Sequence, residues 1–543
     1  MRVVFFLFTA AIAFAQAPPR VGVGITETKL TLHQALESAL KSNLEIEIQR
    51  TTLATANEAA KAARGAFDPL FRWQPSLESR TIPTASPLLG AEGKLVERVA
   101  VQNVQISQRL PWHGATLVAG FDNSRQSTTN PFSGLTPFYN SRLLLQFQQP
   151  LLRNRKTDAS RAEIQIRSRN TDISRTELEL KVIDVVTRTE TAYWDLVAAR
   201  QDVEVKADGM QWAREQLDRT RRMIESGTLA AVELAAAEAE LERRADSFHA
   251  AVGTLTEVEN GLKLLIASER SQDIWTDAIV PVEERTAGTT GAEELAEATR
   301  LALGKRPELR QLDLLDQNNG TQKKLASDQM KPQLNLVGSY INSGLAGAVQ
   351  PTENPFAESS LATAARLNEL SRLNGLAPLS PVNFGGVPPG LLGGYGSALS
   401  NLFGGSFPAV QLGVSMEWNM RNRTAESTLS QAVISERRLR LQRTQLEQVI
   451  AAQVRNSLQA LATARQRIIA AEASARAAQE KLDSEVRLFQ NGESTNFLVL
   501  TRQNELSDSR RRVVVSRLEF NKAVARLRQA SGTTLEAHSL QVP

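Results

Sequence analysis

The chain contains no cysteine, few aromatic residues and no long apolar run. Aromatic residues make up 5% of its 543 residues, and the mean hydropathy is −0.26. Without cysteine, the chain has no disulfide, thiolate metal ligand, catalytic thiol or lipidated N-terminal cysteine. Its 63 basic and 59 acidic residues are mixed in sequence and give a net charge of +4, so no basic block points to nucleic acid. A polytopic helical membrane protein is also excluded, because no run reaches the ~20 apolar residues of a spanning helix.

The first residues have the composition of an export signal. Arg2 is followed by the apolar run Val3–Ala15, which ends in the small-x-small pattern Ala13-Phe14-Ala15. A transmembrane anchor would need a longer run, whereas a secretory signal has this length and this ending. We therefore expect residues 1–15 to be a signal peptide, with a mature, unlipidated chain that starts near Gln16. If that chain enters a membrane, it must cross as strands.

The mature sequence carries an internal duplication. A shift of 265 positions aligns about 70 residues with a later segment, and a shift of 263 aligns the starts of the two halves, Leu32 with Leu295. We predict repeats over 16–292 and 293–543, each opening with a helix, with a linker around Ala287–Gly291. The longer match pairs Leu196 with Leu461, Arg222 with Arg487, Gly227 with Gly492 and Leu262 with Leu527.

Long helical hairpins dominate both repeats. Neither half has a proline in its helical span, and a glycine interrupts each span once, at Ser226-Gly227 and at Asn491-Gly492. We predict hairpins over about 153–270 and 421–530, with arms of ~65 residues that reach ~100 Å at 1.5 Å per residue. The seven-residue spacing of the apolar positions predicts coiled packing of the arms. These positions are Leu234, Leu241, Phe248, Leu255 and Leu262 in the first half, and Val499, Leu506, Val513, Phe520 and Leu527 in the second.

Between the helices the apolar pattern alternates with period two, which predicts strands. We expect strands within about 70–149, at about 333–342 and at about 409–420, with a long external loop over 344–407 in which 361–376 could form a short helix. In the first half, Pro111–Gly114 reads as a tight turn, so that half holds four strand-like runs. The alternation fits a water-soluble sheet equally well. The export signal and the aromatic residues at the strand ends favour a sheet that faces lipid: Trp73, Phe147, Tyr340 and Trp418.

These strands are too few to close a barrel within one chain. An open sheet in lipid leaves backbone groups unpaired, so other copies must complete the barrel. We therefore predict an oligomer in which every copy contributes strands to one shared barrel.

Taken together, these features resemble the TolC-type outer-membrane factor family over nearly the whole mature chain. The segments that carry the resemblance are Leu30–Leu36 with Asn43, Gly65–Pro69 before the first strand, Gln149–Asn154 after the last strand of the first half, and the two glycine-centred tips. The resemblance implies an α+β membrane protein: a homotrimeric outer-membrane β-barrel continued by a long periplasmic α-helical coiled-coil barrel. It also implies a periplasmic adaptor and an inner-membrane transporter as partners, outer-membrane lipid around the barrel, and twelve strands, four per copy. The four runs of the first half leave that strand count open.

By the same resemblance, the hairpin tips are the expected adaptor contacts, although each glycine also simply makes its turn. These residues are Ser226, Gly227, Thr228 and Leu229 in the first tip, and Asn491, Gly492, Glu493, Ser494 and Thr495 in the second.

The possible periplasmic gate departs from the family pattern. Two aspartates that form an acidic ring in relatives are replaced here by Leu498 and Thr501. Glu233 is the matching acid after the first tip, and its basic partner would fall at Ser494. We expect closure by hydrophobic narrowing through Phe497 or Leu498, with ordinary helix packing as the alternative role of Phe497.

No pattern in the sequence points to catalysis, a cofactor or a metal. The four histidines lie far apart, and the arginine-rich stretch Arg510–Arg512 is interpreted as helix surface. The predicted function is a passive exit duct for small molecules or proteins in a tripartite efflux or type I secretion system, in the outer membrane with a periplasmic extension. The alternative is an exported coiled-coil scaffold, or adhesin-like envelope protein, without a pore.

Overall fold

The computed structural model describes residues 20–24, 26–85, 93–228, 230–267, 273–282, 294–350, 355–380 and 386–542. The predicted signal peptide, the linker around Ala287–Gly291 and Leu229 lie outside these residues. The chain forms two compact units, and each takes segments from both predicted repeats, so the repeat boundary at 292/293 stays a prediction. The helical unit contains residues up to Ala56, Asn170–Asp316 and Arg438 onward; the sheet unit contains Asn57–Arg169 and Gln317–Arg437.

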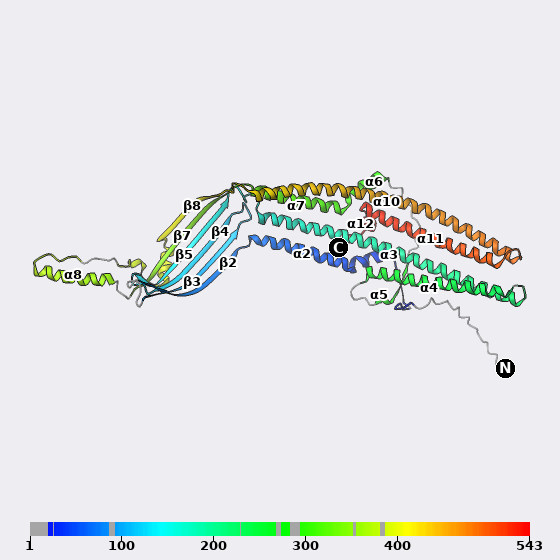
Figure 1. Ribbon diagram of the computed structural model, residues 1–543, viewed down its shortest axis with the longest axis horizontal. Coiled ribbons are helices and arrows are strands. Elements are labelled where there is room, and N and C mark those ends of the chain that lie inside the picture. Colours follow the sequence, from blue (N-terminus) through cyan, green and yellow to red (C-terminus); the bar gives the residue numbers. More distant parts are fainter. Residues whose placement is uncertain are drawn as a thin grey trace, which may run out of the picture. The chain divides into compact units, whose positions relative to one another are not determined.

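Two helical hairpins form the larger part of the helical unit (Figure 1). The first consists of α3 (Ala159–Glu225) and α4 (Val232–Ile266), and the second of α10 (Arg423–Gln490) and α11 (Asn496–Ser531). The first arms have 67 and 68 residues, but the second arms have only 35 and 36. The prediction of equal arms is therefore wrong. The heptads that predicted the second arms stop at Leu262 and Leu527, and these helices end within one turn of those residues.

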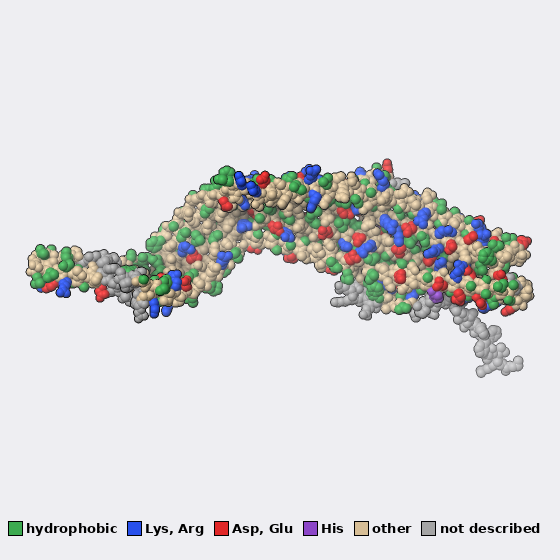
Figure 2. Space-filling model, in the orientation of Figure 1, with side chains coloured by type: hydrophobic (Ala, Val, Ile, Leu, Met, Phe, Trp, Pro, Cys, Tyr) green, Lys and Arg blue, Asp and Glu red, His purple; other side chains and the backbone are tan. Residues whose placement is uncertain are grey.

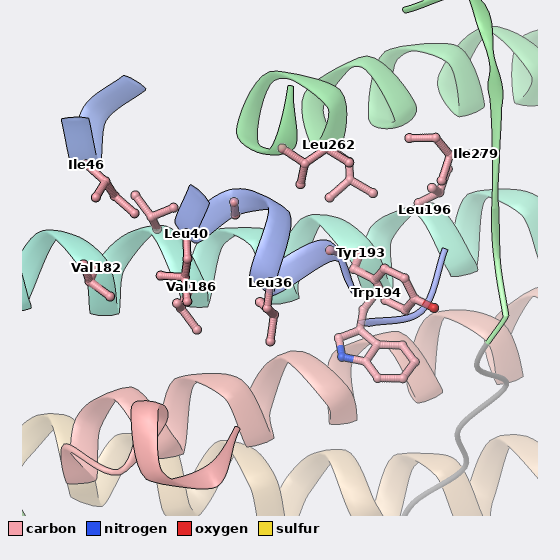
Figure 3. Packing of buried hydrophobic residues seen from close by; sticks show 14 of the residues in the cluster. Leu36, Leu40, Ile46, Val182, Val186, Tyr193, Trp194, Leu196, Leu262 and Ile279 are labelled. Atoms are coloured by element: carbon pink, nitrogen blue, oxygen red, sulfur yellow. The ribbon is translucent and has the colours of Figure 1, made fainter. Parts of the chain in front are cut away.

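The first hairpin is held by a core that two short helices complete. Figure 3 shows Leu36 of α1 (Leu32–Ser42) and Ile46 of α2 (Leu44–Arg64) among apolar side chains of α3 and α4. Thr31 caps α1 in a capping box with Gln34, which explains one of the segments that carried the family resemblance. Full burial of each such side chain contributes about 1.5–3 kcal/mol.

The second hairpin has its own apolar clusters. Ala298 and Ala302 of α6 (Leu295–Lys305) pack with Ile450 and Val454 of α10. Seven of the ten predicted heptad positions are buried, whereas Leu234, Leu241 and Val513 are half-buried. The buried seven are Phe248, Leu255, Leu262, Val499, Leu506, Phe520 and Leu527. The remaining elements of this unit are the parallel pair β1 (Glu27–Leu30) and β6 (Ala278–Pro281), α5 (Asp273–Thr276), α12 (Thr534–Ala537) and the first part of α7 (Pro307–Gln329).

A series of ion pairs joins α3 to α11. Lys522 lies 2.6 Å from Asp195, and Arg528 lies 3.2 Å from Glu190. Arg511 lies 3.3 Å from Asp202, and the Arg510 guanidinium lies over the Trp212 ring at 5.2 Å. The arginine-rich stretch therefore pairs with side chains of a neighbouring helix.

The sheet unit is built on one antiparallel sheet of six strands in the order β2-β3-β4-β5-β7-β8 (Figure 1). The tight turn at Pro111–Gly114 joins β3 to β4, with positive φ at His113 and Gly114, and the four predicted runs of the first half are confirmed. The helices α2, α3, α7 and α10 all connect to strands at the same end of the sheet as this turn. The strands are Leu70–Pro83, Lys94–Arg109, Thr116–Thr128, Leu135–Pro150, Gln333–Val349 and Phe407–Glu417.

The segment predicted as a long loop over 344–407 is mostly structured. The strand β7 runs to Val349 and does not end near 342, so the predicted strand was too short. The helices α8 (Pro355–Leu373) and α9 (Tyr395–Phe403) follow, and α8 confirms the short helix expected there. The strand was underestimated because its second half, Gly344–Val349, is rich in glycine and alanine and lacks the apolar–polar alternation of the first half.

Candidate functional site: the two faces of the sheet and the hairpin tips

One face of the sheet carries an apolar band. Residues paired across antiparallel strands point to the same face, so the register assigns each side chain to a face. Charged side chains crowd the surface of the long helices, whereas hydrophobic ones spread over the strands (Figure 2). We call the face of the sheet that carries the apolar band the apolar face. Its central row is Phe71, Ile106, Ala119, Leu145, Tyr340 and Val410, flanked by Trp73, Val104, Phe121 and Leu143 on one side and by Leu117, Phe147 and Leu412 on the other.

The opposite face is mixed, with more polar side chains than the apolar face, and we call it the polar face; its apolar members include Val118, Leu144, Val337 and Ile341. Arg142 donates from Nε to Asp122 Oδ2 at 3.0 Å across β4 and β5. Other side chains on this face are Arg72, Gln74, Asn103, Gln105, Gln146, Ser339 and Gln411. A sheet with one apolar and one more hydrophilic face fits a boundary between lipid and water.

The apolar band runs obliquely across the strands. On β2 its members are Phe71 to Leu77, centred at Gln74; on β8 they are Pro408 to Trp418, centred at 413. Residues that pair across the sheet form rows perpendicular to the strands. The row that starts at Gln74 of β2 ends at Phe407 of β8, which is six residues before the centre of the band at 413. The centre of the band therefore moves ~20 Å along the strands while it crosses five strand intervals, or ~24 Å. If the band lies parallel to a membrane plane, the strands are tilted by ~40° from the membrane normal.

The four predicted interface aromatics all lie exposed on the apolar face or next to it. The exposed fraction is 58% for Trp73, 38% for Phe147, 37% for Tyr340 and 63% for Trp418. Trp73, Phe147 and Trp418 lie near strand ends, as predicted. Tyr340 lies in the middle of β7, so its predicted place at a strand end is wrong, because β7 continues beyond the alternating segment.

Both edges of the described sheet lack a neighbouring strand. In the part of the chain that the structure describes, β2 pairs only with β3, and β8 pairs only with β7. The two strands run antiparallel to each other, so β8 of one copy could pair with β2 of another. An open edge exposes a row of backbone donors and acceptors, which is a template for such pairing.

The two hairpin tips have the same backbone geometry. In the first, Gly227 has φ +76° and donates to Ile224 O at 3.0 Å, while Thr228 N donates to Met223 O at 2.9 Å. In the second, Gly492 has φ +80°, and Glu493 N donates to Leu488 O at 2.9 Å. Both are Schellman motifs, in which a left-handed glycine ends the helix.

The tip residues are mostly exposed, and side-chain hydrogen bonds hold both tips; in the first, the Ser226 and Thr228 hydroxyls donate to Met223 O. Ser226, Gly227, Thr228, Asn491, Gly492, Glu493 and Thr495 are exposed, and Ser494 is half-buried. The Thr495 hydroxyl caps α11 by accepting from Leu498 N, and Ser494 donates to Glu485. Asn496, only 4% exposed, accepts a hydrogen bond from Gln216 of α3. Ser494 thus has an acidic partner on its own hairpin, and Asn496 links the hairpins at a position that the sequence pattern did not single out.

Of the four predicted gate residues, Glu233 lies in the first turn of α4, Phe497 and Leu498 in the first turn of α11, and Thr501 in its second turn. Phe497 is 72% exposed and Leu498 is 37% exposed, whereas the next residue, Val499, is buried. Thr501 donates to Phe497 O at 2.8 Å, and Glu233 is half-buried. Most of the Phe497 side chain is therefore exposed in the described part of the chain.

Among the carboxylates of the helical unit whose pKa values are lowered, Glu45 and Glu240 each pair with two cationic side chains. A hydrogen bond from Arg188 of α3, assisted by Lys181, lowers the pKa of Glu45 below its usual value. Burial acts to raise the pKa of Glu240, but hydrogen bonds from Arg244 and Arg243 outweigh it and leave that pKa lowered. Both act as structural ion pairs, because neither lies beside a nucleophile or a cluster that could bind metal.

Two other features are absent from the described part of the chain. None of its helices is both long and apolar enough to span a bilayer. Nor do its His, Asp and Glu side chains form a group that could hold a metal ion.

Comparison with solved structures relates this geometry to known proteins. The outer-membrane protein VceC of Vibrio cholerae matches with a TM-score of 0.60 and 13% identity over 92% of this chain and 96% of that chain. The Campylobacter jejuni outer-membrane channel CmeC matches with 0.60 and 14% over 93% and 86%, and the Neisseria gonorrhoeae channel MtrE with 0.55 and 14% over 93% and 89%. The chain has the TolC-type outer-membrane channel fold. No sequence family and no curated protein matches the chain.

Within the TolC-type fold, the large sheet has six described strands where the resemblance implied four barrel strands per copy. The extra pair lies in the first half, where the turn at Pro111–Gly114 adds a hairpin. The sequence pattern signalled these strands, and it did not signal the contacts that helix α9 makes with the sheet.

Proposed function

We propose that this chain is the outer-membrane channel of a tripartite efflux or type I secretion system, in which three copies share one β-barrel. The observation that carries this proposal is the combination of a two-faced sheet with two unpartnered edge strands. In lipid, each unpaired backbone group costs several kcal/mol, so β8 of one copy and β2 of the next must pair. A scaffold protein without a pore would have no use for an apolar face that ends in open edges.

The dimensions of the apolar band agree with a membrane barrel. From Pro408 to Trp418 the band covers ten residue steps, or ~33 Å along β8, which a tilt of ~40° reduces to ~25 Å, the height of the apolar band in outer-membrane barrels. Six strands from each of three copies make eighteen. At this tilt, the barrel radius is ~18 Å between strand axes, large enough for an aqueous lumen lined by the polar face.

The helical unit supplies the periplasmic part of the proposed duct. The tips around Gly227 and Gly492 are proposed to contact the adaptor, since they are exposed and their backbones are equivalent. Phe497 and Leu498 are proposed to narrow the duct, because both are exposed apolar side chains at the start of a helix that is fixed by Asn496. The chain binds no energy source in this proposal, so an inner-membrane transporter drives export.

Conductance combined with thiol labelling tests the function. The protein is extracted from membranes with detergent and inserted into planar bilayers, where we expect discrete channel conductance. Neighbouring single-cysteine variants Gln411→Cys and Val410→Cys differ only in the face they occupy. A charged, water-soluble thiol reagent should react at 411 and change the conductance, while 410 stays protected by lipid.

Two results would contradict the proposal. One is an extracted oligomer that never conducts, even after substitution at the proposed gate. The other is equal reactivity of positions 410 and 411. Either result would favour the coiled-coil scaffold.

A further inference from the structure

Helix α9 packs directly on the apolar face of the sheet. Asn342, Gly344 and Ala346 follow Tyr340 at alternate positions of β7, so they occupy the same face, and α9 covers them. A side chain at Gly344 would overlap the Ala398 carbonyl oxygen and lie 2.6 Å from Leu402 N. Only glycine allows the helix to approach the strand this closely.

The helix covers the part of this face that is polar. Ser141 and Asn342 are 0% and 4% exposed, although each lies beyond the apolar rows on its strand. Ser141 donates to Asn123 Oδ1 at 2.8 Å, the Tyr395 hydroxyl donates to the same oxygen at 3.1 Å, and Asn342 donates to Leu402 O. Helix α9 thus gives hydrogen-bond partners to side chains that would be costly to expose to lipid.

The exposed residues of α9 are uncharged, and two of them are aromatic: Tyr395, Gly396, Ser400 and Phe403. The helix, Tyr395–Phe403, contains no charged residue. Phe403 is 74% exposed and Tyr395 is 41% exposed, while Ala398 and Leu402 are buried against the sheet. An uncharged helix with one side on the sheet and an exposed phenylalanine on the other is unusual for a loop in water.

We propose that α9 is embedded in the membrane as part of the lipid-facing surface, and that lipid acyl chains cover Phe403. This inference rests on the proposed function. It is supported by continuity, because Asn342 lies only two residues beyond Tyr340 of the apolar band. A second copy is the less suitable occupant, because α9 contacts β5 and β7, whereas copies would meet at the edges β2 and β8.

Fluorescence quenching by spin-labelled lipid tests this placement. Because the native chain has no cysteine, Phe403→Cys, Val410→Cys and Gln411→Cys each carry one bimane label. All three positions are exposed in the single chain, so the variants should fold. The assembled protein is placed in phosphatidylcholine vesicles whose lipids carry a nitroxide near the top of the acyl chain.

We expect the lipid nitroxide to quench the bimane label at position 403 at least half as strongly as the label at 410. The label at 411 should show no quenching above background. Quenching at 410 without quenching at 403 would overturn the position of α9 and leave the proposed function intact. It would assign Phe403 to water, to another copy or to a protein partner. Equal quenching at 410 and 411 would overturn the proposed function itself.

Discussion

Arginine substitutions on β8 should separate the two faces of the sheet by their energetic cost. Leu412 lies on the apolar face, one residue from the centre of the band, and Gln411 lies beside it on the polar face. An arginine near the bilayer midplane of a barrel costs about 2–4 kcal/mol, and the cost falls to ~0–1 kcal/mol near the interfaces. Met416 is three residues from the centre, ~10 Å along the strand and ~8 Å in depth at the tilt derived above. We therefore expect Leu412→Arg to cost more than Met416→Arg, and Gln411→Arg to cost less than ~0.5 kcal/mol.

The assay is equilibrium unfolding by guanidinium in lipid vesicles at fixed protein concentration, because assembly makes the apparent stability depend on concentration. Leu412→Ala serves as the reference that removes the side chain without adding charge. Equal losses for arginine at 411 and 412 would refute the assignment of the faces. A loss that is larger at 416 than at 412 would refute the position of the band.

Three further predictions concern the helical unit. Gly492→Val should impair export, because a residue with a Cβ pays ~1–2 kcal/mol for the left-handed backbone of this tip and the tip should change its conformation. The oligomer should remain intact, because no atom beyond the adjacent residues lies within 4 Å of a Cβ at this position. Unchanged export would show that this tip has no part in the mechanism. Phe497→Ser should raise the conductance of the closed channel in planar bilayers, with Ile469→Ser on the exposed surface of α10 as the control, and identical traces for both would exclude a hydrophobic gate at 497. Glu45→Gln should lower the thermal stability by ~0.2–1 kcal/mol at neutral pH, because the carboxylate is partly exposed and its pairs are screened. The pKa of Glu45 is lowered in the folded state, so its contribution to stability is present above the usual pKa of a glutamate and is lost as the pH falls through the lowered folded value. The variant and the native protein should therefore become equally stable once the pH is below that value, and a difference that stays constant with pH would contradict the pairing with Arg188.

The sequence predicts those elements whose side chains follow a simple period. The heptad from Leu234 to Leu262 located α4, and the glycine at 492 located the second tip, because a left-handed turn and a coiled seam each demand particular residues locally. The first-half strands were found for the same reason, since one face of each meets a different environment from the other.

The features that the sequence did not predict depend on contacts between distant segments, and no local periodicity encodes such contacts. The second half of β7 was missed because its face is covered by α9, so that small residues such as Gly344 replace the large apolar ones that alternate elsewhere. The link between Gln216 and Asn496 joins residues on different hairpins, and neither residue belongs to a repeating pattern. The length of the second arms was overestimated because the absence of proline permits a helix without requiring it to continue.

A disulfide between β2 and β8 of separate copies is the most direct test of the shared barrel. The centre of the apolar band moves by about one residue per strand interval. If this displacement continues from β8 of one copy to β2 of the next, Ser76 of β2 lies opposite Gln411 or Gly413 of β8. In a chain without native cysteine, Ser76→Cys combined with Gln411→Cys or Gly413→Cys should yield reducible covalent multimers up to a trimer. Ser76→Cys combined with Leu412→Cys should not, because that residue points to the other face. Monomers alone from every combination on the polar face, in protein taken from membranes, would contradict the account.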